Sequence, residues 1–332
     1  MPNSLLFILF ISSFLSTAQS TDFIDFDFSR ADSIALINSN LKLTNPEKLA
    51  ETLVKGLDSE PEKFRAIFRW ITNNISYDTR MLSLQQTKEL KLRYDKEKLL
   101  RWRQRFAVKV YRRTRTKKKS ICEGYSRLLG AMCRQVGISC ETIQGYSRQA
   151  SSTIGKRKLN HAWNAVKINN KWYLTDATWA SGYVSGRYFL RKFNKIYFLA
   201  DPSYFIADHY PADKAWTLLW DKPSLSDFTN APIKLEGFYK KNIVHFSPEE
   251  GVIKIAKDST VSFSFTSNEL KISRVSTETI NKFRSSLNRL YHLVKSDEGY
   301  YVFQHKFTEK GNYRFYIYID SDETFAYDVY IK

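Results

Sequence analysis

The spacing of apolar residues predicts helices in the first part of the chain and strands after them. Four stretches carry apolar residues at helical spacing: 46–57, 59–74, 84–113 and 123–135. The second begins well, with Ser59 as N-cap, Pro61 in the first turn and Glu62 at the third position. Gly137 suits the end of the last helix. Three strands are then predicted, at 141–147, 161–168 and 171–179.

The pair Asn169-Asn170 predicts a tight two-residue turn between the last two of these strands, because Asn tolerates positive φ. Such a turn sets the pairing, so that Trp163 faces Asp176 and His161 faces Thr178. Side chains alternate between the faces of a strand. His161 and Asp176 therefore share a face as diagonal neighbours, whereas a slip of one residue would separate them.

The last third of the chain changes to short alternating strands separated by turns. The predicted strands are 252–255, 261–265, 300–303, 313–319 and 325–331. This pattern is typical of an immunoglobulin-like β-sandwich of about a hundred residues. We predict two domains, at 21–230 and 231–332. The second carries no convincing catalytic set, and a binding or spacer module is the default interpretation.

The N-terminus indicates export. An apolar run at 5–14 is too short to span a bilayer and is followed by small residues. Residues 1–20 are therefore predicted to be a signal peptide, cleaved after Ala18 or Ser20, which leads to the periplasm or the extracellular space. A buried N-terminal helix is the alternative. No later stretch predicts a transmembrane helix.

Charge adds a candidate docking surface. The 332 residues include 52 Lys and Arg against 34 Asp and Glu, a formal net charge of +18. Ten of these cations and no acid fall within 101–120. Such a segment attracts an anionic substrate, surface or glycan, although a solvated face is the plainer interpretation. The candidate docking residues are Arg112, Arg113, Lys117 and Lys118. Nucleic acid is disfavoured because no nucleic-acid-binding motif accompanies them.

The chain has three cysteines, and this odd number leaves at least one free thiol. Cys122 is the natural candidate. Cys133 follows about three helical turns later on the same helix face, and a Cys133–Cys140 disulfide stays open as an alternative to two buried thiols. No CxxC pair and no HExxH motif occurs, so we expect neither a metal nor an organic cofactor.

Cys122, His161 and Asp176 together suit thiol catalysis. Cys122 is predicted at a helix start, where unpaired amides and the helix dipole favour a thiolate and can bind an oxyanion. An imidazole can take and return its proton, and a carboxylate can fix the imidazole tautomer. Each residue also has a plain interpretation: a buried cysteine, a structural histidine and a turn cap. The joint occurrence favours catalysis.

Three segments in order carry a resemblance to a known family: 122–126 (CEGYS), 161–164 (HAWN) and 172–179 (WYLTDATW). They resemble the transglutaminase-like superfamily of papain-fold thiol enzymes, and in particular the branch of kyphoscoliosis peptidase-like proteins. The resemblance covers about residues 60–220 and departs at Ser120-Ile121, where that branch often has Gly-Val. It implies an α+β fold, with a helix carrying the cysteine packed on an antiparallel sheet.

On the matching positions, the resemblance implies that Cys122 is the nucleophile, His161 the general base and acid, and Asp176 the orienting group. Tyr77 is a candidate oxyanion donor, and Trp163 is interpreted as a core residue or a wall of the substrate groove. His209 matches a downstream segment of the family and is interpreted as structural.

The function expected from these features is that of an exported cysteine enzyme acting on peptide or glutamine-type amides through a thioester. Hydrolysis is favoured over amine transfer, because water needs no acceptor groove. The alternatives are a protein-cross-linking transglutaminase and a non-catalytic surface-binding protein that keeps the fold. A protein or peptide is the expected substrate.

Overall fold

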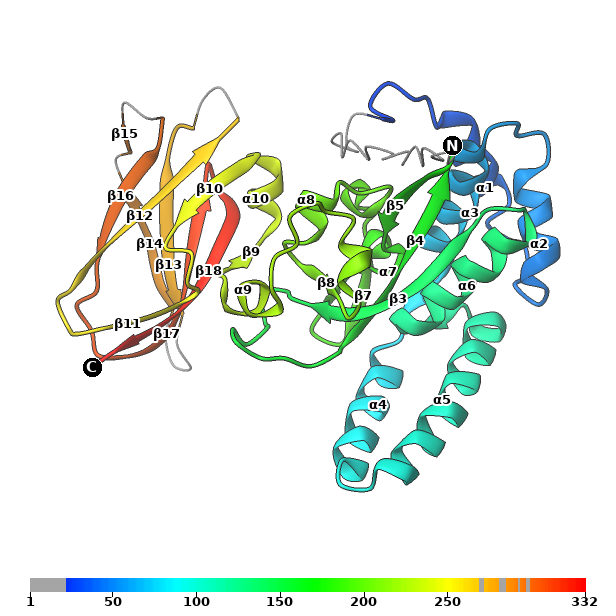
Figure 1. Ribbon diagram of the computed structural model, residues 1–332, viewed down its shortest axis with the longest axis horizontal. Helices are drawn as coiled ribbons and strands as arrows, with labels where there is room; N and C mark the ends of the chain where they lie inside the picture. Colours follow the sequence, from blue (N-terminus) through cyan, green and yellow to red (C-terminus); the bar gives the residue numbers. More distant parts are fainter. Residues whose placement is uncertain (1–21, 269–271, 281–284, 292, 297–298) are drawn as a thin grey trace, which may run out of the picture.

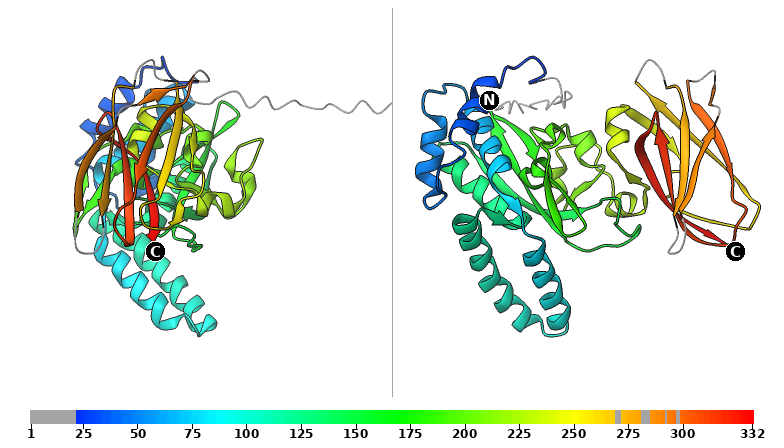
Figure 2. Two further views of the ribbon diagram at one scale, coloured as in Figure 1. Left: turned by 90° about the vertical axis from the view of Figure 1, so that its left-hand side faces the viewer. Right: turned by 180° about the vertical axis from the view of Figure 1, so that it is seen from behind.

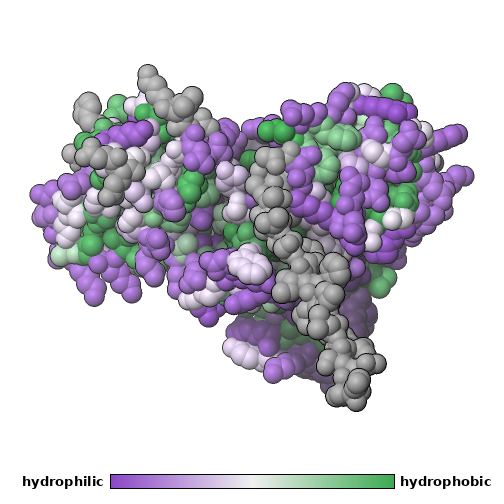
Figure 3. Space-filling view, turned by 45° about the horizontal axis from the view of Figure 1, so that its top comes forward, coloured by the Kyte–Doolittle hydropathy of each residue, from purple (hydrophilic) through white to green (hydrophobic). Residues whose placement is uncertain are grey.

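Two lobes follow one another along the chain (Figure 1). The computed structural model describes residues 22–268, 272–280, 285–291, 293–296 and 299–332. The predicted signal peptide, residues 1–20, lies outside this part. A notch separates the lobes in the space-filling view, where hydrophilic residues cover most of the visible face (Figure 3).

The N-terminal lobe is built on an antiparallel sheet in the order β5-β4-β3-β8. Its strands are β3 (Cys140–Ser147), β4 (His161–Ile168), β5 (Lys171–Thr175) and β8 (His209–Pro211). Helix α6 (Cys122–Gln135) packs on β3 and β4. Helices α2 (Pro46–Val54) and α3 (Glu60–Asn74) contact α6, and α1 (Ser29–Ile37) packs on α3. The predicted Ser59 cap is confirmed, since its Oγ accepts from the Glu62 amide.

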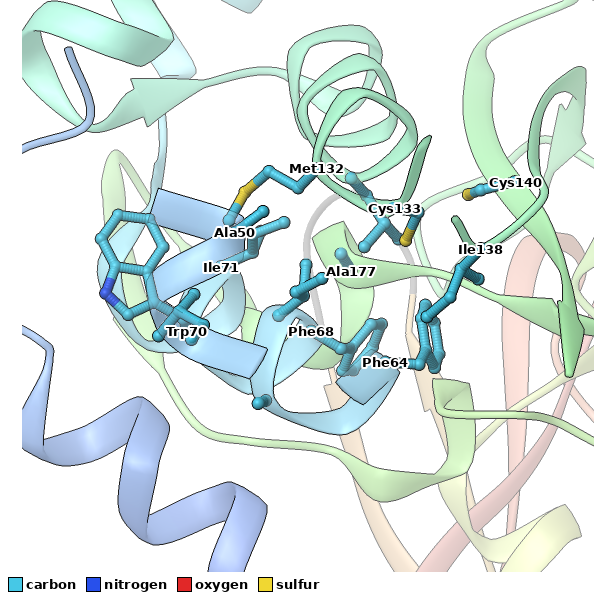
Figure 4. Packing of buried hydrophobic residues seen from close by; sticks show 14 of the residues in the cluster. Ala50, Phe64, Phe68, Trp70, Ile71, Met132, Cys133, Ile138, Cys140 and Ala177 are labelled. Carbon is cyan, nitrogen blue, oxygen red and sulfur yellow. The ribbon is translucent and has the colours of Figure 1, made fainter. Parts of the chain in front are cut away.

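Apolar side chains from these helices form the main core of the lobe. Figure 4 shows Phe64, Phe68 and Ile71 of α3 directed toward Met132 and Cys133 of α6. These five side chains are fully buried. Burial of each large apolar side chain contributes about 1.5–3 kcal/mol, so this core fixes the position of α6 against α3.

The charged helical pattern at 84–113 becomes two helices rather than one. Helix α4 (Thr79–Leu92) and helix α5 (Lys96–Lys117) form a hairpin that projects from the lobe in every view (Figure 2). Asp95 starts the second helix, because its carboxylate accepts from the Lys98 amide. The ends of the hairpin are joined by parallel pairing of β1 (Ser76–Tyr77) with β2 (Lys119–Ser120).

The predicted pairing around Asn169-Asn170 is confirmed over the length of β5, in which Ile168 faces Lys171 and Asn164 faces Thr175. Both turn residues have positive φ. The strand predicted to reach residue 179 is too long, however. It ends at Thr175, and Asp176 becomes the N-cap of the short helix α7 (Ala177–Ser181).

Smaller elements complete the N-terminal lobe. They are β6 (Gly182–Ser185), β7 (Tyr188–Arg191), the 3-10 turns at Lys195–Tyr197 and Lys214–Thr217, α8 (Pro202–Phe205) and α9 (Leu225–Asn230). The chain then enters the second lobe through β9 (Ile233–Lys234), so the predicted boundary at 230/231 falls between α9 and β9.

The C-terminal lobe is a β-sandwich, as expected. One sheet contains β10 (Ile243–Ser247), β12 (Thr260–Ser267), β16 (Tyr301–Lys306) and β15 (Val294–Lys295). The other contains β11 (Val252–Ile255), β18 (Asp322–Ile331), β17 (Gly311–Ile319), β13 (Val275–Ile280) and β14 (Ser285–Tyr291), with β9 beside β18. Helix α10 (Glu236–Lys240) packs on β18. Phe263 and Phe315 meet between the sheets.

Helix α5 approaches α6 so closely that the contact depends on Gly124. A Cβ at this position would lie 2.0 Å from Ser120 Oγ, 2.7 Å from Thr114 Oγ1 and 2.9 Å from Val110 Cγ1. We therefore expect Gly124→Ala to lower the free energy of unfolding by about 1–3 kcal/mol through overpacking. Urea denaturation measures this.

Gly130, in the same helix, is the matched control. Its Cβ would meet the mobile end of Arg134 at 3.2 Å, and alanine favours a helix by about 1 kcal/mol over glycine. Gly130→Ala is expected to be neutral or stabilising. Equal losses in the two variants would show that α5 does not constrain the start of α6.

Candidate active site

Cys122 is the first residue of α6. Ile121 precedes it in extended conformation, and among the described residues no side chain caps this helix. The Gly124 amide already donates to the Ile121 carbonyl at 2.9 Å, so the amides of Cys122 and Glu123 are the ones available to a negative charge. Cys122 is half-buried, whereas Cys133 and Cys140 are buried free thiols. The structure thus gives one accessible cysteine, at the position that favours its thiolate.

The root of the α4–α5 hairpin lies directly beside this cysteine. Tyr77 pairs with Ser120, and the Asp78 amide donates to the Ser120 carbonyl at 2.7 Å. Burial and then the charge of Cys122 raise the pKa of Tyr77 well above its ordinary value. The phenol consequently stays protonated and remains a hydrogen-bond donor next to the cysteine.

His161, the first residue of β4, joins Cys122 to Asp176. Its Nε2 donates to Asp176 Oδ2 at 2.7 Å, and its side chain also hydrogen-bonds to Cys122. Burial lowers the pKa of the imidazole, but the nearby Asp176 carboxylate and the bonds to Asp176 and Cys122 outweigh it and raise the pKa to about 10. At neutral pH the imidazole is therefore charged, which favours a thiolate beside it.

Asp176 is held by its own helix as well as by histidine. As the N-cap of α7 it accepts from the Thr178 amide at 2.7 Å and the Trp179 amide at 3.2 Å, both through Oδ1. Oδ2 is left for His161. Burial raises the pKa of this carboxyl, yet the positive charge and hydrogen bonds of His161 and His209 lower it overall. The carboxylate is thus ionised and fixed in orientation.

His209 is the residue at this site whose role sequence reasoning missed. It is fully buried, and its Nε2 donates to the same Asp176 Oδ2 at 3.1 Å. Its Nδ1 faces Asp208 Oδ1. Two carboxylates on one imidazole require both nitrogens to donate, so His209 is an imidazolium. Burial lowers its pKa, but Asp208 and Asp176 raise it overall.

The donor atoms of His161, Asp176 and His209 lie within 4.8 Å of one another, close enough to raise the question of a metal. Zinc binds nitrogen at about 2.0–2.1 Å, which places two tetrahedral ligands about 3.3 Å apart. Asp176 Oδ2 lies only 2.7 Å from His161 Nε2. This separation suits a direct hydrogen bond, so the cluster is a proton network.

Trp163 does not line a substrate groove, because it is 1% exposed. Its ring instead packs against the rings of His161 and His209, with centroids 6.0 and 5.1 Å away. The groove alternative for this residue was wrong, and the core alternative holds. Trp163 limits the positions that the two imidazoles can take.

Two of the four predicted docking residues are used inside the fold. Arg113 Nε donates to the buried Asp78 carboxylate. Lys118 Nζ donates to the Ser39 carbonyl at 3.1 Å and lies over the Trp70 ring. These two side chains hold the root of the hairpin in place. Their internal contacts cannot be inferred from a run of basic residues in the sequence. Arg112 and Lys117 are exposed, as predicted.

A known protein family matches the part of the chain that carries Cys122, His161 and Asp176. Residues 47–177 match the profile of the Transglutaminase-like superfamily. The chain is 34% identical over 212 residues to the kyphoscoliosis peptidase of Mus musculus, and 34% identical over 213 residues to that of Homo sapiens. This chain contains a transglutaminase-like domain at residues 47–177. The predicted family is confirmed, and the similarity places the chain in the kyphoscoliosis peptidase-like branch.

The transglutaminase-like chain spans only part of these relatives. The mouse match covers 62% of this chain and 29% of the mouse protein. The Lim and transglutaminase domain protein ltd-1 of Caenorhabditis elegans is 26% identical over 238 residues, which is 65% of this chain and 29% of that protein. In the described ranges, no helix has the length and apolar character needed to cross a membrane.

We expect the charged His161 to accelerate alkylation of Cys122. At pH 6, His161→Gln is predicted to react with iodoacetamide at least about tenfold more slowly than wild type, because a neighbouring positive charge stabilises the thiolate. Mass spectrometry of the peptide containing Cys122 measures the rate. His245→Gln, an exposed histidine of the second lobe, is the control and is expected to behave as wild type. Equal rates in all three proteins would contradict an activated thiol.

Proposed function

We propose that this protein is a cysteine enzyme that opens peptide or glutamine-type amides through a thioester. The observation that carries the proposal is the chain of alternating charges from Asp208 through His209, Asp176 and His161 to Cys122. A binding protein has no need of an accessible thiol in contact with a buried, charged imidazole.

In the proposed reaction, the Cys122 thiolate attacks the amide carbon to give a tetrahedral intermediate. His161 gives its Nδ1 proton to the leaving amine, because Nε2 is committed to Asp176. The C–N bond breaks and a thioester remains. Water then loses a proton to the neutral His161 and attacks the thioester. The acid product leaves, and the thiolate–imidazolium pair is restored.

The negative oxygen of the intermediate requires donors. The uncapped first turn of α6 offers backbone amides, and Tyr77 offers a phenol that remains protonated. We therefore assign the oxyanion site to this pair of elements. His209 is a positioning residue, because it holds the Asp176 oxygen that binds His161.

The same thioester is open to an amine, which would make the protein a cross-linking transglutaminase. Hydrolysis remains the preferred proposal, since it needs no acceptor groove. A non-catalytic protein that keeps the fold is the remaining alternative. A hydrolase, a transglutaminase and a non-catalytic protein would all share this fold. They differ in whether Cys122 forms a thioester and in whether water or an amine then reacts with it.

A peptide library derived from a proteome separates these outcomes. We expect wild type to generate new peptide termini and Cys122→Ala to generate none, as read by mass spectrometry. Cys133→Ala is the matched control, because that thiol is buried away from the site. A fluorescent primary amine added to the reaction would be incorporated by a transglutaminase. Cleavage that survives in Cys122→Ala would refute the thiol mechanism, and inactivity of a folded wild type would favour the binder.

We further propose that the hairpin docks an anionic partner surface or glycan, along a row of cations on α5. Arg101, Arg105, Lys109 and Arg112 recur at spacings of four, four and three and are all exposed. Such spacing places them on one helix face. Of the predicted set, Arg112 belongs to this row and Lys117 stays an exposed candidate outside it, whereas Arg113 and Lys118 are withdrawn because of their internal contacts.

Elution from immobilised heparin tests this surface. Replacing Arg105, Lys109 and Arg112 by Glu is expected to lower the eluting salt concentration, because fewer counterions are released on binding. The control replaces Lys254, Lys257 and Lys306, exposed or half-exposed residues of the second lobe, by Glu and changes the net charge equally. An equal shift in both variants would mean that overall charge, rather than the hairpin, drives the binding.

Export is proposed on the N-terminal sequence alone, with residues 1–20 as a signal peptide and the periplasm or extracellular space as destination. The direct test is N-terminal sequencing of the exported protein, which is expected to begin after Ala18 or Ser20. A chain retained inside the cell with Met1 present would contradict it.

A further inference from the structure

A cleft lies between the two lobes, and Cys122 is not among the residues that line it. Its volume is about 380 Å³, and its walls come from the end of α8, from α9 and from β9 and β10. The apolar part of the wall includes Ile206, Phe228, Val244 and Phe246. Nothing in the proposed amide chemistry uses this space.

Two cations line this cleft. Arg148 is 6% exposed, and its terminal nitrogens donate to the carbonyls of Phe228 and Ala231. Its Nε has no hydrogen-bond partner in the described part of the chain. Lys234 Nζ lies 4.8 Å from the ring centre of Phe238 and 5.0 Å from that of Phe246. It forms no hydrogen bond or ion pair with any described residue.

Burial and then the charge of Arg148 lower the pKa of Lys234 to about 8, against a raising effect of Asp208. The ammonium is therefore mostly charged at neutral pH, yet poorly solvated. Lys234 is half-buried, and a charge partly removed from water is costly unless an opposite charge accompanies it. The two cation–π contacts stabilise the ammonium charge less than full hydration would.

The carboxylates of the cleft do not supply that opposite charge. Asp227, Glu249 and Glu250 also line it, but all three are exposed. Asp227 accepts from the Ser224 amide and so caps α9. Over the described ranges, none of the three pairs with Arg148 or Lys234. The cleft thus has cations inside, acids at its mouth and apolar walls between them.

We propose that this cleft binds the free carboxylate end of a peptide with an apolar last residue, with the carboxylate on Lys234. A single negative charge matches the inner cation. The apolar walls suit a large side chain, and amide N–H groups nearer the mouth can donate to the rim carboxylates. A phosphate fits less well, because its higher charge would face three acids.

The cleft is also continuous with the segment that holds the catalytic network. Ile206 and Ala207 line it, and Asp208 and His209 follow directly. The Arg148 amide donates to the Asp208 carbonyl at 2.9 Å. A peptide end bound here would lie beside the residues that orient Asp176. The binding proposal itself stands independently of the proposed enzyme activity.

Calorimetry on the full chain tests the proposal with N-acetyl-L-phenylalanine as the probe and its uncharged amide as the comparison. Cys122→Ala serves as background, so turnover does not contribute. We expect saturable binding of the carboxylate and at least about tenfold weaker binding of the amide. Lys234→Met is expected to lose binding by at least about tenfold as well, whereas Lys254→Met, an exposed lysine of β11, is unchanged.

If Lys234→Met fails to fold, lysine acylation of the wild-type chain, with and without the probe, tests the proposal instead. Acylation by an N-hydroxysuccinimide ester, read by mass spectrometry, is expected to be slowed at Lys234 by the carboxylate probe and not by the amide, with Lys254 unaffected by either. The proposal is overturned if carboxylate and amide bind equally, if neither binds, if a folded Lys234→Met binds as wild type, or if inorganic phosphate binds more tightly than the carboxylate.

Discussion

The site depends on one carboxylate that is shared three ways. Asp176 starts helix α7 through one oxygen and accepts from both His161 and His209 through the other. Each contact restrains a different element: α7, the start of β4 and β8. Removing the charge would leave two buried imidazolium groups without their common partner, which is strongly unfavourable in a low-dielectric interior. The geometry of the thiol site therefore depends on the hydrogen bonds that the Asp176 carboxylate accepts.

The hairpin of α4 and α5 is tied to the site at its root. Parallel pairing of β1 with β2 closes it, Arg113 binds the buried Asp78, and Gly124 admits α5 against α6. Tyr77 pairs with Ser120 at the end of this closure, and therefore lies beside Cys122. The hairpin thus carries an exposed row of basic residues on α5, and its root packs beside Cys122.

The two lobes meet at a segment that belongs to both functions proposed above. Residues 206 and 207 line the interlobe cleft, and residues 208 and 209 continue the charge network. Arg314 of the sandwich reaches back to the carbonyls of Ala150 and Ser152. The sandwich is thereby fixed against the N-terminal lobe close to Asp208, and the position of one lobe bears on the surroundings of the other.

Local rules in the sequence were enough to predict the cysteine at a helix start, the strand pairing set by Asn169-Asn170, the sandwich, and the meeting of His161 with Asp176, because each depends on neighbours in the chain or on one tight turn. The same rules predicted β5 to be too long, because the sequence does not distinguish the end of a strand from the N-cap of the helix that follows it. Only the tertiary structure brought His209, 33 residues beyond Asp176, onto the same oxygen. It also decided which cations of the basic run are free. Arg113 bonds to the buried Asp78 and Lys118 to the Ser39 carbonyl, both in distant segments, and no pattern along one helix encodes a contact with another.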